Sequence, residues 1–203
     1  GMKRDGHPAL SMTQHAANKY CQWVSFQTGH FYRLPTEAEW EFACRAGSDT
    51  NSSWGADAQK AVEYAWFGGD ASTHYNVPGQ KKPNLLGFHD MHGNVLEWTL
   101  DQYVPNRREY FAKDKVHNPW VKATKPYPHV TKGGHWQQSL KEISAAARHQ
   151  STPIWKVADP QRPRSLWYHT TTPWLGLRIV RPAKIPTVEE MYHYWNSGVE
   201  ADE

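Results

Sequence analysis

The alternation of apolar and polar positions along the chain predicts three amphipathic helices. Each follows a Ser or Thr that has Gln or Glu three residues later, which is the pattern of a capping box at a helix N-terminus. Gly29 and Gly47 are suited to end the first two helices, because glycine adopts the left-handed conformation of a helix end without strain. The predicted helices span residues 12–27, 37–46 and 188–196. In the first helix, the apolar positions at helical spacing predict a buried face made of Ala16, Ala17, Tyr20, Trp23 and Val24.

Three short apolar runs predict strands, at residues 31–34, 143–148 and 176–180. The connecting segments 48–83 and 99–130 are rich in turn-forming residues and show little periodicity. The chain also holds 11 Trp, 10 Tyr and 6 Phe, and the indole N–H and phenol groups among them need partners when they are buried. These features favour an irregular, loop-rich interior over a helical bundle.

The remaining totals narrow the class of protein. With 203 residues, of which 38% are hydrophobic and 21% charged, the chain fits one soluble globular domain with a sizeable core. The net charge is +3 and the basic residues are scattered, so we expect no nucleic acid partner. No apolar segment approaches the length of a membrane span, and no signal peptide opens the chain. The two cysteines, Cys21 and Cys44, make neither a disulfide framework nor a zinc site.

A cluster of oxygen-bearing side chains stands in the middle of the chain. Asp90, Asn94 and Glu97 lie within eight positions, and Gly93 allows the sharp turn that brings them together. Hard oxygen ligands on a tight turn suit Ca²⁺. The spacing is not that of an EF-hand loop, so an ordinary polar turn held by side-chain hydrogen bonds is the alternative.

Five motifs follow one another along the chain: RLPTEAEWE (33–41), GFHDMHGNVLEW (87–98), KGG (132–134), AAAR (145–148) and GLR (176–178). In this order they resemble the motifs of formylglycine-generating enzymes, the sulfatase-modifying-factor superfamily. The resemblance covers roughly residues 8–182 and implies an α+β, C-type-lectin-like fold with little regular secondary structure. It assigns residues 1–182 to this domain and residues 183–203 to a C-terminal helical extension. The family usually carries further strands upstream, so we expect an N-terminally incomplete domain that a missing segment or a second chain completes.

The resemblance also locates the residues on which the family chemistry depends. Its active members bind copper through a cysteine pair after the Gly-Gly motif, because soft thiolates select Cu(I). Those positions hold Gln138 and Ile143 here, so we expect neither copper nor formylglycine generation. Cys21 and Cys44 match family positions that are disulfide-bonded in some members to C-terminal strands, where this chain has Ala145 and Ile179. We therefore expect two buried free thiols, with a Cys21–Cys44 disulfide as the alternative.

For the central turn, the resemblance implies a structural Ca²⁺ site. The ligands carried over are the Asp90 side chain, the Gly93 and Val95 carbonyl groups and the Glu97 side chain. Asn94 becomes a turn residue. A second calcium site of the family would be lost, because Tyr64 stands where an Asn ligand is expected.

The leading functional hypothesis is a noncatalytic or re-purposed domain that binds a peptide, glycan or protein partner. Its cleft would lie between the segment after Gly134 and the Pro-rich loop, residues 150–173. The expected contacts are aromatic and polar side chains, which suit a recognition surface: His135, Trp136, Gln138, Arg148, Trp167, His169 and Trp174.

Two other hypotheses remain open. A metal-dependent oxidoreductase, related to nonheme-iron sulfoxide synthases, would need a new site built from His129, His135, His149 or His169. A variable ligand-display protein is the third, although residues 135–175 are not Asn-rich. We expect a periplasmic or secreted location rather than a cytoplasmic one.

Overall fold

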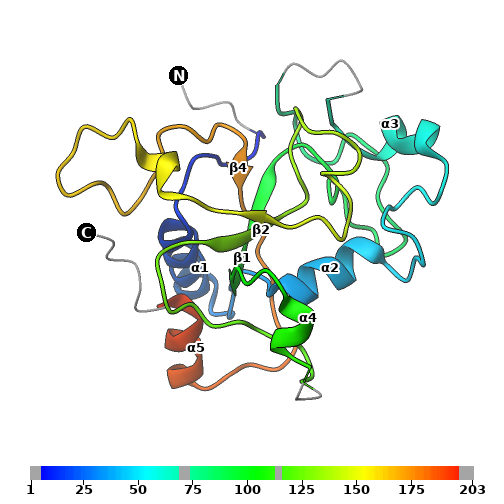
Figure 1. Cartoon of the computed structure of the whole chain (residues 1–203). Helices are drawn as coiled ribbons and strands as arrows, with labels where there is room; N and C mark the ends of the chain where they lie inside the picture. Colours follow the sequence, from blue (N-terminus) through cyan, green and yellow to red (C-terminus); the bar gives the residue numbers. More distant parts are fainter. Residues whose placement is uncertain (1–5, 69–73, 113–115, 197–203) are drawn as a thin grey trace.

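One small, curled sheet lies at the centre of the molecule (Figure 1). This computed structural model describes residues 6–68, 74–112 and 116–196. The strands are β1 (Leu96–Gln102), β2 (His129–Lys132), β3 (His149–Gln150) and β4 (Leu175–Gly176). Their order in the sheet is β3-β2-β1-β4, with β4 parallel to β1 and the other neighbours antiparallel. The expected mixed α and β fold with little regular secondary structure is confirmed.

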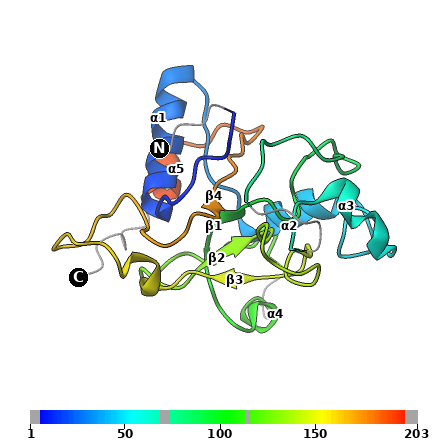
Figure 2. The same cartoon turned by 90° about the horizontal axis from the view of Figure 1, so that it is seen from above.

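Helices surround this sheet without forming a layer of their own. They are α1 (Gln14–Thr28), α2 (Glu37–Arg45), α3 (Ala61–Tyr64), α4 (Arg107–Tyr110) and α5 (Val188–Trp195), with 3₁₀ turns at Ala58–Lys60 and Pro153–Lys156. Helices α1 and α5 pack on each other, and α2 packs on β1 and β2 (Figures 1 and 2). Among the described residues, no helix combines the length and the apolar character that crossing a membrane requires.

The three long helices are found where the sequence predicts them, and two of the caps are confirmed. At both α2 and α5 a capping box is complete: Thr36 pairs with Glu39, and Thr187 pairs with Glu190. The start of α1 differs from the prediction, because its N-cap is Thr13 rather than Ser11.

The predicted buried face of α1 is wrong. Tyr20 and Trp23 are 45% and 57% exposed, and of the five predicted residues only Ala17 is buried. The polar residue Gln14 is buried instead, because its Nε2 donates a hydrogen bond to the backbone oxygen of Thr99 in β1, at 2.6 Å. The buried residues of the helix are Gln14, Ala17, Asn18, Cys21 and Ser25.

Two of the predicted strands do not form. Residues 31–34 make one isolated bridge, between Arg33 and Val180. Residues 143–148 form turns, in which the backbone N–H of Ala145 donates to the oxygen of Asn51, and β3 begins only after them. An apolar run fits either a strand or a buried turn, and contacts far away in sequence select the turn here.

The central strand was hidden in a segment that reads as a loop. Residues 99–102 belong to the predicted irregular segment, yet they complete β1. The predicted closing strand at 176–180 is shorter than expected, since β4 ends at Gly176. Every residue of β1 is buried, including its polar ones, which removes the alternation that marks a half-exposed strand.

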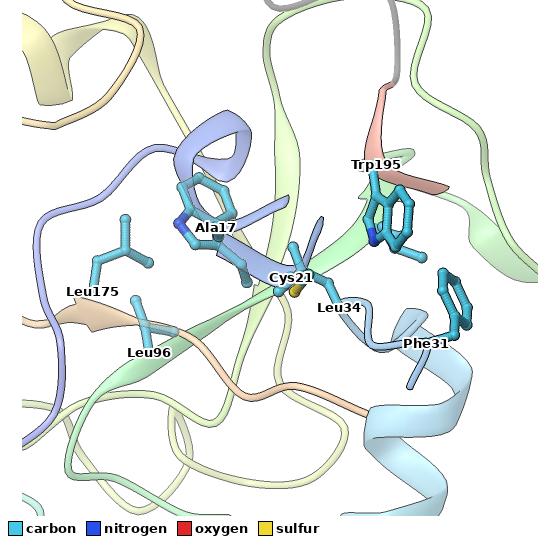
Figure 3. Close-up of a cluster of buried hydrophobic side chains, with 9 residues drawn as sticks. Ala17, Cys21, Phe31, Leu34, Leu96, Leu175 and Trp195 are labelled. Carbon is cyan, nitrogen blue, oxygen red and sulfur yellow. The ribbon is translucent and has the colours of Figure 1, made fainter. Parts of the chain in front are cut away.

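The largest core cluster lies between α1, α5 and the sheet (Figure 3). Trp195 of α5 is buried in this core, and its indole N–H donates to the backbone oxygen of Tyr32, at 2.8 Å. Burying a large apolar side chain contributes about 1.5–3 kcal/mol, so such a cluster supplies much of the stability. Its buried members are Ala17, Cys21, Phe31, Leu34, Leu96, Trp98, Leu100, Leu175 and Trp195.

Candidate functional site

The turn that leads into β1 has a backbone that few residues can adopt. Asp90, Gly93 and Asn94 have φ angles of 55°, 72° and 59°. At Gly93 a Cβ atom would lie 1.9 Å from the backbone oxygen of Trp66, so no other residue fits without moving the facing segment. The sequence prediction that a glycine makes this turn is confirmed.

Asn94 acts as a turn residue. Its Oδ1 accepts from the backbone N–H of Asn76 at 2.9 Å, and its Nδ2 donates to the backbone oxygen of the same residue at 3.1 Å. The side chain is 1% exposed, and both ends of its amide are used. It therefore holds two loops together, and it also lines the cavity described below.

Asp90 keeps one oxygen unused. Its Oδ2 accepts from the backbone N–H of Gly79 at 2.6 Å. Its Oδ1 is buried and has no hydrogen-bond partner among the described residues. Burial raises the pKa of this carboxyl, because a charged oxygen without a partner is costly away from water. A cation at Oδ1 would supply the missing partner.

Glu97 is already held from two sides. Its Oε2 accepts from Trp40 Nε1 at 2.7 Å and from Arg178 Nε at 2.9 Å. Its Oε1 accepts from Arg178 Nη2 at 2.9 Å. An ionised carboxylate offers about four lone-pair sites. One site, on Oε1, therefore remains for a cation.

The donors of this turn are of the chemical kinds that a calcium ion takes. Asp90, Val95 and Glu97 line a cavity of about 460 Å³, here called the ion-turn cavity, together with Arg178 and Pro8. Gly93, the fourth predicted ligand, is not part of its lining. Two carboxylates and backbone carbonyls are the oxygen donors that Ca²⁺ prefers, although Arg178 neutralises one of the two charges.

The described residues offer no richer metal site. No group of three or more His, Cys, Asp or Glu side chains among them is arranged to hold a metal ion. This holds for the four histidines that the oxidoreductase hypothesis would use. A cation in the ion-turn cavity would therefore depend on two carboxylates and on main-chain oxygens.

After Gly134, the residues at both positions where the family places a cysteine make contacts that support the fold. The Oε1 of Gln138 accepts from the backbone N–H of His135 at 2.9 Å. Ile143 is 0% exposed and packs with Ala61, Ala65 and Phe67. Neither position presents a reactive group to a substrate.

The two cysteines are buried free thiols, as expected. Both are 0% exposed, and no disulfide joins them. Burial raises the pKa of each thiol to about 12. Because the thiolate is the reactive and metal-binding form, neither cysteine is activated at neutral pH.

Three of the predicted cleft residues meet in an aromatic array. His135 stacks on Trp174 with ring centroids 4.8 Å apart, and Trp174 meets the edge of Trp155 at 5.3 Å. His169 lies against Trp155 in turn, at 5.4 Å. Burial, aided by the nearby His149, lowers the pKa of His135 to about 4, so that its imidazole is neutral at pH 7. Sequence reasoning missed Trp155, which joins the two ends and has no local signal beyond its place in the Pro-rich loop.

The other predicted contacts lie elsewhere or serve the fold. Trp167 is 57% exposed and packs edge-on against His15 of α1. Trp136 donates its backbone N–H to the oxygen of Asn94, which ties it to the turn that leads into β1. Arg148 is not brought to the array, because its guanidinium pairs with the buried carboxylate of Glu37, with Nη2 3.0 Å from Oε2.

A cavity of about 730 Å³ opens at the His169 end of the array. We call it the lead-in cavity, because residues 7–11, the segment that leads into α1, form one of its walls. His169 is 3% exposed, and burial, with the positive charge of Lys156, lowers its pKa to about 3. Pro8 lines both this cavity and the ion-turn cavity. The other residues around it are His7, Ala9, Leu10, Ser11, Tyr75, Tyr168, His169, Thr170 and Pro173.

Comparison with solved structures supports the fold. PvdO from Pseudomonas aeruginosa superposes with a TM-score of 0.71 at 24% identity, over 89% of this chain and 64% of that one. Treponema denticola variable protein 1 superposes with a TM-score of 0.68 at 20% identity, over 90% of this chain and 74% of that one. At these identities the likeness shows a shared fold and nothing about activity.

Sequence comparison places the chain more closely. Formylglycine-generating enzyme of Mus musculus is 32% identical over 167 residues, covering 75% of this chain and 42% of the enzyme. Serine/threonine-protein kinase pkn1 of Chlamydia pneumoniae is 32% identical over 148 residues, covering 72% of this chain and 22% of the relative. The chain thus spans less than half the length of these curated relatives. The family model of the sulfatase-modifying factor enzyme 1-like domain matches residues 2–159. The chain therefore belongs to the family of formylglycine-generating-enzyme-like, sulfatase-modifying factor domains.

Proposed function

We propose that this chain is a noncatalytic member of its family that binds a peptide, glycan or protein partner. The observation that carries the proposal is the chemistry at the two cysteine positions, where Gln138 is held by a backbone N–H and Ile143 is buried in the core. An amide and a hydrocarbon side chain cannot take the place of two thiolates that bind copper and pass electrons to oxygen.

No other thiol in the chain can take over this role. The sequence holds two cysteines, and both are buried with a pKa of about 12. The fold is kept while the reactive groups are replaced, which is the pattern expected of a domain that recognises a ligand without transforming it. The aromatic array and the lead-in cavity supply the concave, aromatic surface on which such recognition depends.

An oxygen-consumption assay tests the noncatalytic part of the proposal. The whole chain is supplied with Cu(I), a reductant and a sulfatase-type cysteine peptide, and the peptide is then examined by mass spectrometry for the aldehyde. We expect oxygen uptake equal to the protein-free blank. Mouse formylglycine-generating enzyme, assayed in parallel with the same peptide, serves as the positive control. Aldehyde formation that Cys44→Ser abolishes would overturn the proposal.

Glycan and peptide arrays test the binding part. Trp167 is one of the cleft residues that the sequence predicts, and it is 57% exposed next to Tyr168 of the lead-in cavity, so Trp167→Ala is expected to weaken binding to any ligand that the arrays identify. Tyr192→Ala is the matched control, because Tyr192 is similarly exposed, at 55%, but lies on α5. Equal losses in the two variants would show that the predicted cleft is not the binding surface.

We also propose that a structural calcium ion occupies the ion-turn cavity. Asp90 Oδ1, the free lone pair of Glu97 and the Val95 carbonyl would hold it, and the ion would neutralise the charge of Asp90, which Arg178 leaves without an ion pair. Because Pro8 lines this cavity as well as the lead-in cavity, the ion would also fix the wall that the two share.

Calorimetric titration of chelator-treated protein with CaCl₂ and MgCl₂ tests the calcium site. We expect calcium to bind and magnesium to bind far more weakly, since a site of carbonyls and carboxylates on a turn lacks the strict octahedron that Mg²⁺ requires. Asp90→Asn should abolish calcium binding, and Asp57→Asn, the same change at an exposed residue, should not. Unchanged binding in Asp90→Asn would rule out this cavity.

A further inference from the structure

The lead-in cavity is a preformed feature of the fold. Its walls come from three segments that are far apart in sequence: residues 7–11, Tyr75 and residues 168–173. Two backbone hydrogen bonds fix the first segment, from Ser11 N–H to the oxygen of Leu175 at 2.8 Å and from His169 N–H to the oxygen of Ser11 at 2.7 Å. Its volume of about 730 Å³ is in the range of small-molecule sites in proteins.

The cavity carries no side chain that would neutralise a charged ligand. No Asp, Glu, Lys or Arg is among the described residues that line it. His169 is neutral at physiological pH, because burial lowers its pKa to about 3. A carboxylate, phosphate or ammonium group placed here would lose its hydration without gaining an ion pair. The cavity therefore favours an uncharged ligand.

The polar atoms around the cavity are hydrogen-bonding groups with capacity to spare. The imidazoles of His7 and His169 each have a buried Nδ1 without a hydrogen-bond partner among the described residues. The Ser11 hydroxyl donates to the oxygen of Thr172 at 3.0 Å, which leaves its own oxygen free to accept. Neutral imidazoles and hydroxyls both donate and accept, as the hydroxyl groups of a polyol do.

Two tyrosine rings complete the lining. Tyr75 lies nearly perpendicular to His7, with ring centroids 5.9 Å apart, and Tyr168 lines the cavity from residues 168–173. The faces of aromatic rings carry partial negative charge. They attract the polarised C–H groups of a saturated ring that bears oxygen substituents. Aromatic rings beside uncharged hydrogen-bonding groups fit such a ring better than they fit a purely apolar side chain.

We propose that the lead-in cavity binds a neutral sugar ring, as the end unit of a glycan. The inference rests on the proposed binding function and selects one of its ligand classes. The residues that line the cavity do not include Gln138 or Ile143. A test of sugar binding is therefore independent of the test at the two cysteine positions.

Saturation-transfer NMR on the whole chain tests this assignment, with glucose, galactose, mannose and N-acetylglucosamine as probes and glucuronate as the charged counterpart. We expect saturation of at least one neutral sugar, and a dissociation constant at least about tenfold weaker for glucuronate. His7→Ala and Tyr75→Ala should each weaken the binding at least about fivefold, and Tyr192→Ala should leave it unchanged.

The possible outcomes separate this inference from the proposed function. Glucuronate that binds as well as the neutral sugars would overturn the sugar assignment, as would neutral binding that survives both cavity variants. A peptide that binds in place of sugars and is lost in His7→Ala would overturn the assignment while leaving the binding function standing. Cysteine-peptide turnover in the oxygen assay would overturn the proposed function whatever the sugar result.

Discussion

The contact between Glu97, Trp40 and Arg178 joins β1, α2 and the segment after β4, and its removal has a calculable cost. In Glu97→Ala, the Trp40 indole N–H loses its acceptor while the side chain stays 1% exposed. A buried donor without a partner costs about 1–3 kcal/mol. Arg178, whose side chain is 26% exposed, loses its carboxylate, and breaking a buried ion pair costs about 3–5 kcal/mol.

Because water reaches part of the Arg178 side chain, the two terms do not add in full. We expect a total loss of about 3–5 kcal/mol in the free energy of unfolding. For a domain of this size, each kcal/mol lowers the melting temperature by about 2–4 °C. The expected shift is therefore about 10 °C.

Urea unfolding followed by tryptophan fluorescence measures this effect. The denaturation midpoint should fall in Glu97→Ala while its slope stays constant, which indicates a change in stability and not in the unfolded state. Glu63→Ala is the control, since Glu63 pairs with Lys82 on the surface, and no measurable change in midpoint is expected. If Glu97→Ala shifted the midpoint no more than this control, the account of the ion turn would be refuted.

Three further predictions follow from individual residues. Gly93→Ala should cost more than about 2 kcal/mol in unfolding free energy or prevent folding, because its Cβ would meet a backbone oxygen at 1.9 Å, whereas Gly55→Ala, with a φ of 78° and open space, should cost only about 1 kcal/mol. Burial raises the pKa of Asp101 to about 7, so the folded protein keeps a proton that the unfolded chain releases above about pH 4. This contribution to stability should be lost as the pH rises from about 4 through about 7, and urea midpoints for Asp101→Asn should lack that slope; an equal slope would contradict the assignment. Cys21 and Cys44 should not react with Ellman's reagent in the native protein and should both react in urea; fast labelling of the folded chain would show that burial does not suppress the thiolates.

The sequence is a good guide to features that are decided locally. The capping boxes at Thr36 and Thr187 are made within four residues, so reading them needed no knowledge of the fold. The turn at Gly93 could be predicted in the same way, because its positive φ favours glycine, whereas the close approach of Trp66 could not. The family motifs extended this guidance to the fold as a whole, because proteins that share these motifs share one fold.

Features that depend on distant partners could not be predicted from local sequence. Gln14 is buried on α1 because an acceptor on β1 lies opposite, 85 positions away. In the same way, nothing near Glu97 in the sequence indicates that Arg178 donates two hydrogen bonds to its carboxylate. Trp155, which joins the two ends of the aromatic array, becomes a site residue only when the Pro-rich loop folds back.

A competition titration for Cu(I) tests the proposed loss of thiolate chemistry most directly. The reduced whole chain is added to the coloured Cu(I) complex of bicinchoninate, and the absorbance of the complex is followed. Because Gln138 and Ile143 stand at the cysteine positions and both thiols are buried, we predict no loss of colour at one equivalent of protein. Withdrawal of one equivalent of copper by the folded chain would contradict the account.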